Sequence, residues 1–321
     1  MKLIKKTLYK LNGLHYGQEY LCLAKEYFES PLHVYLVDNK QIIKDITNDH
    51  LFTGYSPLIF TFCSYTEWPV DMDIIFSHRH LQSNDLFTKK DAVASLSLKL
   101  IHKQTAGDTA ILYYEGVKGA HHFLSSFHQY IIGLNNRLYN KKPGNVFLHD
   151  NLYKQVQIAY ALPRIISLIT VSNGDAFNLF PTDLHGPVNE QYYVCSLRHE
   201  GKACRQVESA GRIVISQVEH TAYKTVYSLG KNHMQDLKSR DNFPFGPSFS
   251  RLFQLPLPQP ALYYRELELV DSFIHGIHKL LLFKVLSQQV LSNEPHTLAH
   301  IHNVYASWRH NKGLSGNYLL R

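Results

Sequence analysis

Short apolar runs rich in β-branched and aromatic residues recur along the whole chain, and each is bounded by Gly, Pro, Asn or Asp. Runs of this kind are typical of β-strands, because branched and aromatic side chains pack well on a pleated sheet. We predict strands at 33–37, 57–62, 110–117, 164–171, 192–197, 212–218, 261–270 and 280–286. The pattern indicates a mainly β protein, and the spacing in the second half suits a barrel or a sandwich.

Some segments between these runs favour helix, so we expect a mainly β fold with some helix (α+β). The segment 89–104 carries apolar residues at helical spacing, and 119–138 would place Phe123, Phe127, Ile131 and Leu134 on one face. Shorter helices are expected at 202–210 and 221–229. The segment 242–260 holds five prolines and no helical period, so we predict a long surface loop there.

The length of 321 residues is more than one average domain needs and fits two. The segment 141–145, Lys-Lys-Pro-Gly-Asn, breaks both helix and strand and resembles a linker. We therefore expect an N-terminal α+β domain at 1–145 and a second domain at 146–321.

Charge and cysteine content exclude few classes of protein. The formal charge is +7, but the basic residues are scattered, so nucleic acid is not an expected partner. Lysines interrupt the N-terminal segment, which argues against a secretory signal, and no apolar run is long enough to span a membrane. The four cysteines, Cys22, Cys63, Cys195 and Cys204, have no CxxC spacing. A reducing cytoplasm is the expected location.

The most informative segment is 163–218. It reads as a strand, the turn Ser172–Asp175, a short proline-broken strand, a strand ending at Arg198, a helix, and Gly211 leading into a last strand. The Asn-Gly pair inside the turn is a strong hairpin signal, because both residues tolerate positive φ. The step from Gly211 into 212–218 closes the unit.

This order resembles the flavin-reductase-like, FMN-binding split β-barrel family. The resemblance continues at Gly276-Ile277-His278, which is similar to the Gly-Asp-His step of that family, with Ile277 where Asp is usual. Near the C-terminus, Asn303-Val304-Tyr305 stands where relatives have Gly-Arg-Tyr. The resemblance covers about half of the chain and rests on the ordered set of segments.

The resemblance implies an FMN site, with FAD as the alternative flavin and NADH or NADPH as the electron donor. The residues implied for the flavin ring are Asn178, Phe180, Pro181, Thr182, Asp183 and Leu184. The residues implied for the phosphate are Arg198, Lys202 and Arg205, because a helix N-terminus with basic side chains favours anions. His278 is the implied catalytic residue, facing a nicotinamide or another electron donor.

Each of these residues also has a purely structural interpretation. Arg205 can be solvated surface, Asp183 can cap a turn, and His278 can be an ordinary half-buried histidine. Three functions stay open: an FMN-dependent NAD(P)H oxidoreductase of the flavin reductase type, a non-catalytic flavin- or ligand-binding module, and a binder of nucleic acid or anionic surfaces. His300 and His302 suit metal ligation by spacing, but no HExxH motif or Cys/His cluster accompanies them, so no metal is predicted.

The first half contains a similarity to the second. The segment 31–63 parallels 163–196: both have a strand, a turn with Asn, an apolar run, a Thr and Asp step, Gly, and a strand ending near Cys. A diverged second copy of the barrel would explain this, and chance similarity is the alternative. Since relatives pair as dimers with FMN at the interface, either a homodimer or an intrachain pseudo-dimer is expected. No Arg or Lys pair follows Cys63, so the first copy would lack a phosphate site.

Overall fold

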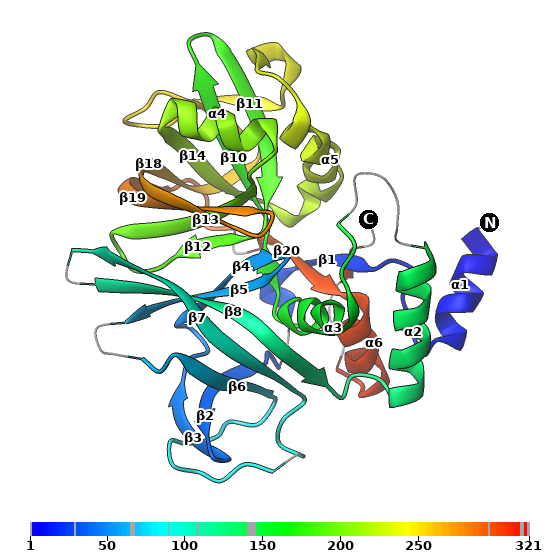
Figure 1. Ribbon diagram of the computed structural model, residues 1–321. Helices are drawn as coiled ribbons and strands as arrows, with labels where there is room; N and C mark the ends of the chain where they lie inside the picture. The colour runs from blue at the N-terminus through cyan, green and yellow to red at the C-terminus, as the bar shows by residue number, and fades with distance from the viewer. Residues whose placement is uncertain are drawn as a thin grey trace. The chain divides into compact units, whose positions relative to one another are not determined.

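The computed structural model describes residues 2–28, 30–64, 68–88, 90–107, 109–139, 146–294, 296–314 and 318–319 (Figure 1). The chain forms two compact units. Unit 1 contains Met1–Leu21, Phe28–Leu162 and Ile301–Gly316, and unit 2 contains Cys22–Tyr27, Pro163–His300 and Asn317–Arg321. Among the described residues, the chain passes between them within β1 (Tyr20–Ala24), between Tyr27 and Phe28, at Pro163 and within β20 (Leu298–His302). The predicted mainly β fold with some helix is confirmed.

Unit 2 is built on one antiparallel sheet of eight strands. Their order across the sheet is β12-β13-β19-β18-β14-β10-β11-β15. Their bounds are Ser167–Asn173 (β10), Ala176–Thr182 (β11), His185–Pro187 (β12), Tyr192–Arg198 (β13), Arg212–Val218 (β14), Lys238–Ser239 (β15), Ala261–His275 (β18) and His278–Val290 (β19). This curled sheet is the split barrel that the sequence predicts.

The sheet covers an apolar core because its strands alternate inward and outward side chains. Ile169, Phe180, Ile215, Leu281 and Phe283 are all buried in this core. The helix α4 (Lys202–Ala210), which was predicted at 202–210, contributes its buried face to this core. A second cluster lies on the other side of β10 and β11, under α5 (Tyr223–Ser228) and η3 (Leu229–Met234). Each buried aliphatic or aromatic side chain contributes about 1.5–3 kcal/mol.

Unit 1 has a seven-stranded antiparallel sheet with the order β3-β2-β6-β7-β8-β5-β4. Its strands are His33–Asp38 (β2), Gln41–Asp45 (β3), His50–Tyr55 (β4), Leu58–Ser64 (β5), Asp71–Ser77 (β6), Ala94–Ala106 (β7) and Thr109–His121 (β8). The helices of this unit are Lys2–Leu11 (α1), Ser126–Tyr139 (α2), Asp150–Ala159 (α3) and Asn303–Asn311 (α6).

The two sheets have the same topology. Taken in chain order, β2, β3, β4, β5, β6, β7 and β8 occupy the places that β10, β11, β12, β13, β14, β18 and β19 occupy in unit 2. In both sheets the two longest strands form a central hairpin. The similarity between 31–63 and 163–196 thus coincides with four strands in each sheet. A difference lies after the fourth strand, where α4 joins β13 to β14 and only a short connection joins β5 to β6.

The helix predicted at 89–104 is wrong, because β7 (Ala94–Ala106) occupies most of that segment. Ala94, Leu96 and Leu98 are buried, whereas Ser95 and Ser97 between them are half-buried. This is the two-residue period of a strand, and β6 and β8 hydrogen-bond β7 on both sides. Pairing on two edges therefore overrides the helical spacing of the apolar residues.

The helix predicted at 119–138 is only partly confirmed, since β8 continues to His121 and α2 begins at Ser126. Phe127 is 68% exposed, whereas Ile132 is buried. The loop predicted at 242–260 contains η4 (Arg240–Asn242) at its start and the strand pair Phe245–Phe249 (β16) and Pro256–Pro258 (β17). The proposed linker at 141–145 lies outside the described residues.

The other predicted elements are present. The eight predicted strands all coincide with strands, and 221–229 contains η2 (His220–Ala222) and α5. The remaining short elements are Lys25–Tyr27 (η1), Arg164–Ile165 (β9) and Tyr318–Leu319 (β21). Among the residues that the structure describes, no helix is long and apolar enough to cross a membrane.

Candidate functional site

The start of α4 is the clearest anion-binding feature of unit 2. The strand β13 ends at Arg198, and Gly201 N–H donates to the Arg198 carbonyl at 3.0 Å, which closes a tight turn. Gly201 caps the helix without any side-chain hydrogen bond. A Cβ at Gly201 would lie 3.1 Å from the Arg198 carbonyl oxygen, so glycine suits this turn. The first N–H groups of α4 have no carbonyl partner within the helix and therefore favour an anion.

Basic side chains surround this helix start. Arg198 and Arg205 are exposed, and Lys202 is half-buried. Lys202 Nζ lies 2.6 Å from Asp236 Oδ2. The hydrogen bond and the positive charge of Lys202 lower the pKa of Asp236. An incoming anion would therefore compete with Asp236 for Lys202, a partner that the sequence did not reveal.

His278 lies directly opposite Arg198 in the ladder between β13 and β19. Its ring is buried, and Nδ1 is 3.0 Å from Ser196 Oγ. Burial first, and then the positive charge of Arg198, lower the pKa of His278 to about 3. The ring is therefore neutral at physiological pH. The fold thus brings His278 next to the predicted phosphate residues, but it places the ring inside the protein.

Asn178 connects the predicted ring segment with α4. Its side chain is buried, and Nδ2 donates to Gln206 Oε1 at 2.7 Å and to the Asn232 carbonyl at 3.0 Å. Its Oδ1 has no hydrogen-bond partner among the described residues. Since Gln206 belongs to α4, this contact links β11 to the helix that carries Lys202 and Arg205.

The rest of the predicted ring segment is more enclosed than we expected. Phe180 is fully buried in the barrel core, and Thr182 and Leu184 are buried as well. The carbonyl of Pro181 accepts a hydrogen bond from His233 Nε2 at 2.7 Å, and that of Leu179 accepts one from Asn232 Nδ2 at 2.8 Å.

These two backbone carbonyls are therefore occupied by side chains of η3. Pro181 and Asp183 are the half-buried members of the segment. Asp183 Oδ2 lies 2.7 Å from His300 Nδ1, which pairs it with a residue far along the chain.

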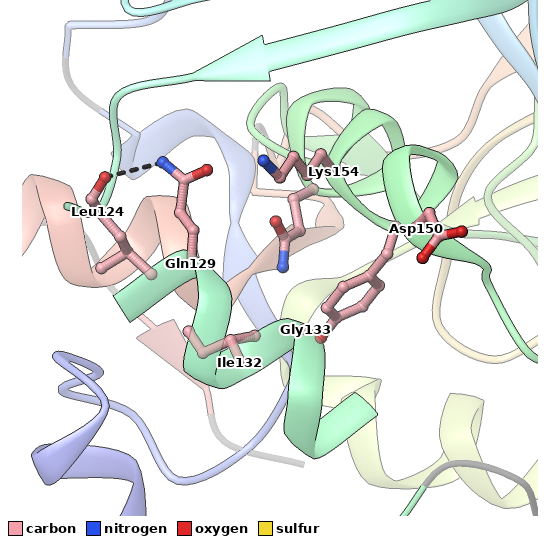
Figure 2. A pocket seen from close by; sticks show the side chains of 8 residues that line it. Leu124, Gln129, Ile132, Gly133, Asp150 and Lys154 are labelled. Carbon is pink, nitrogen blue, oxygen red and sulfur yellow. Dashed lines mark hydrogen bonds between the residues drawn. The ribbon is translucent and has the colours of Figure 1, made fainter. Parts of the chain in front are cut away.

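Unit 1 contains a small cavity between α2 and α3 (Figure 2). Gln129, Lys154 and Gln157 provide polar groups, and Ile132 and Leu124 provide apolar surface. Gln129 Nε2 donates to the Leu124 carbonyl at 2.9 Å. The volume is about 30 Å³, which is room for one water molecule and far too little for a flavin.

Solved structures similar to this chain are flavin reductases and FMN-binding proteins. An FMN-binding protein from Thermus thermophilus with bound p-hydroxybenzaldehyde is 17% identical, with a TM-score of 0.39 over 44% of this chain and 86% of that chain. The NADH:FAD oxidoreductase SgcE6 of Streptomyces globisporus C-1027 is 12% identical, with a TM-score of 0.41 over 46% and 87%. The styrene monooxygenase flavin reductase of Pseudomonas putida S12 is 16% identical, with a TM-score of 0.37 over 45% and 90%.

No family model and no curated protein matches the chain. The resemblance to flavin-reductase-like proteins is confirmed for about half of the chain, and the fold assignment itself rests on the strand order of unit 2. In fold, unit 2 is a flavin-reductase-like split β-barrel.

Proposed function

We propose that unit 2 binds FMN, with the phosphate at the start of α4. The observation that supports this most is the position of Arg198, which stands at the end of β13, directly before α4 and opposite His278. Three basic residues and unpaired helix N–H groups are thereby concentrated at one place. A flavin phosphate carries the negative charge that such a place favours.

The candidate residues of unit 2 match the phosphate end of FMN better than its ring end. The phosphate end fits the start of α4, where the N-cap Gly201 provides no side-chain hydrogen bond, together with Arg198, Lys202 and Arg205. At the ring end, Pro181 and Asp183 are accessible enough to contact a ligand. The buried Asn178, Phe180, Thr182 and Leu184 support this segment from within the barrel. FAD is the alternative flavin, since its larger nucleotide would extend beyond the same phosphate position.

The proposed activity is that of an NAD(P)H-dependent oxidoreductase of the flavin reductase type, in which a bound flavin accepts a hydride. His278 is proposed to position Arg198, because its buried neutral ring hydrogen-bonds Ser196 and lies opposite Arg198 in the ladder. The burial of His278, together with Ile277 in place of Asp, favours the second candidate, a flavin-binding module without reductase activity.

We further propose that the two units are copies that pair within one chain, with a homodimer as the alternative. The shared strand topology supports this proposal. Unit 1 lacks a counterpart of α4 between β5 and β6 in its described residues, so only unit 2 is proposed to bind flavin. None of the four cysteines, all in the described part of the chain, forms a disulfide, which is in keeping with a cytoplasmic location.

Titration with FMN followed by anaerobic addition of NADH or NADPH tests the proposal. We expect quenching of FMN fluorescence on binding, and bleaching of the bound flavin by one of the two nucleotides if the protein is a reductase. Binding without bleaching by either nucleotide would favour the flavin-binding module. A chain that leaves FMN fluorescence unchanged would contradict both candidates.

A further inference from the structure

Four side chains of unit 2 form a continuous row of hydrogen bonds. Cys22 Sγ lies 2.6 Å from the Tyr227 hydroxyl, which contacts Nε2 of His300. His300 Nδ1 lies 2.7 Å from Asp183 Oδ2. The four residues come from β1, α5, β20 and the segment after β11, so the fold assembles them from distant parts of the chain.

The carboxylate of Asp183 fixes the tautomer of the His300 ring. A carboxylate only accepts hydrogen bonds, so Nδ1 of His300 carries a proton and donates it to Asp183. In the neutral ring, Nε2 is then the free base, and it faces the hydroxyl of Tyr227. The side chains of His300 and Asp183 are 16% and 18% exposed, so this pair is neither fully buried nor fully hydrated.

Tyr227 occupies the position that a nucleophile has in a nucleophile–base–acid arrangement. Its O–H donates to His300 Nε2, and the oxygen accepts the S–H of Cys22. Loss of the phenol proton is favoured by the base beside it, and the thiol donor stabilises the resulting phenolate. The tyrosine is itself half-buried on the short helix α5.

We propose that Tyr227, His300 and Asp183 form an acid–base site in which Tyr227 reacts with an electrophilic carbonyl compound. The phenol oxygen attacks the carbonyl carbon while its proton passes to His300 Nε2. The bond from that carbon to its leaving group breaks, and the leaving group takes the proton from His300. Tyr227 is the reacting residue, and His300 and Asp183 position and deprotonate it.

The reaction of Tyr227 requires no bound flavin. In this site the carboxylate of Asp183 contacts His300 rather than a flavin. Arg164 Nη2 donates to the backbone carbonyl of Asp183 at 3.3 Å, which helps to fix this segment. The four residues were not connected by any sequence pattern.

N-acetylimidazole, an acyl donor for phenols, is a suitable probe on the full-length protein. Acetylation of each tyrosine is followed over time by peptide mass spectrometry. Tyr223, one turn earlier on the same helix and also half-buried, is the internal reference. We expect Tyr227 to be acetylated at least tenfold faster than Tyr223. His300→Gln should reduce the rate at Tyr227 by roughly a hundredfold, the typical contribution of a general base.

Asp183→Asn should also slow the acetylation of Tyr227. The acetylation rate of Tyr223 should stay the same in His300→Gln and in Asp183→Asn. A constant rate at Tyr223 shows that α5 is still folded, so loss at Tyr227 is not a result of unfolding. Cys22→Ala removes the thiol donor. It should slow the acetylation of Tyr227 by a smaller factor than His300→Gln does. Equal rates at Tyr227 and Tyr223 in the wild-type protein, or an unchanged rate in His300→Gln, would overturn the proposal.

Discussion

Ser196 Oγ lies 3.0 Å from Nδ1 of His278, and both side chains are buried between β13 and β19. Burial, followed by the charge of Arg198, lowers the pKa of His278 from 6.5 to about 3. The unfolded chain binds a proton below pH 6.5, whereas the folded chain does so only near pH 3. The stability from the neutral ring is therefore complete above pH 6.5 and is lost as the pH falls from 6.5 towards 3.

A His278→Gln variant should consequently be less sensitive to acid. Over this pH range the wild-type protein should lose roughly 4 kcal/mol more than the variant at most. Hydrogen exchange of the β13 and β19 amides, measured by mass spectrometry across the pH range, reports this difference. Ser196→Ala keeps the titrating ring and should retain the acid sensitivity. An identical pH response of His278→Gln and wild type would show that the ring is not held neutral.

Substitutions at Asp236 and at Lys202 should change the affinity for anions in opposite directions. Asp236→Asn removes the competitor for Lys202 and should tighten binding of FMN and of inorganic phosphate. Lys202→Met should weaken both by about three- to tenfold, since it removes one half-buried positive charge from the helix start. Lys238→Met removes the same charge nearby and serves as the control. Isothermal titration at two salt concentrations measures the effect, and equal losses in both lysine variants would argue against a local site at α4.

Phe180 should affect the stability of unit 2 rather than its affinity for flavin. The ring is fully buried in the barrel core. Phe180→Leu should reduce the free energy of unfolding by about 1 kcal/mol or more. Phe177→Leu, at a half-buried position of the same strand, should cost less. Urea unfolding and FMN titration separate the two effects, and a variant of full stability with weakened FMN binding would place Phe180 at the flavin ring.

Glu266 should stabilise the turn before β17. Its buried carboxylate accepts hydrogen bonds from the N–H groups of Leu252 and Phe253, the shortest at 2.7 Å. Glu266→Gln replaces a charged acceptor and should cost about 1–3 kcal/mol. Glu268→Gln is the matched control, because Glu268 pairs with Arg212 at the surface and such pairs contribute little. Equal stability of both variants would contradict the role of Glu266.

The eight strands predicted from the sequence are present because each carries its own local pattern. The runs at 192–197 and 212–218 are apolar, short and bounded by turn residues, and both are central to the barrel. The strand β7 was misread because its apolar residues also fit a helical period. Only the pairing with β6 and β8 distinguishes the two interpretations, and such pairing depends on residues elsewhere in the chain.

The polar contacts of the candidate sites could not be predicted from local pattern. Ser196 and His278 are 82 residues apart, and Asp183 and His300 are 117 apart. Each residue type alone is compatible with a surface position. The occupation of the Pro181 carbonyl by His233 was equally invisible, because η3 has no distinctive sequence signal.

Binding of FMN is the central claim, and equilibrium titration of the full-length protein with FMN tests it most directly. Flavin fluorescence and visible absorbance are followed in the wild type and in the double variant Arg198→Met with Lys202→Met. We predict saturable quenching at one flavin per chain, with affinity at least tenfold weaker in the double variant. No quenching by the wild-type chain, or equal affinity of the two proteins, would contradict this account.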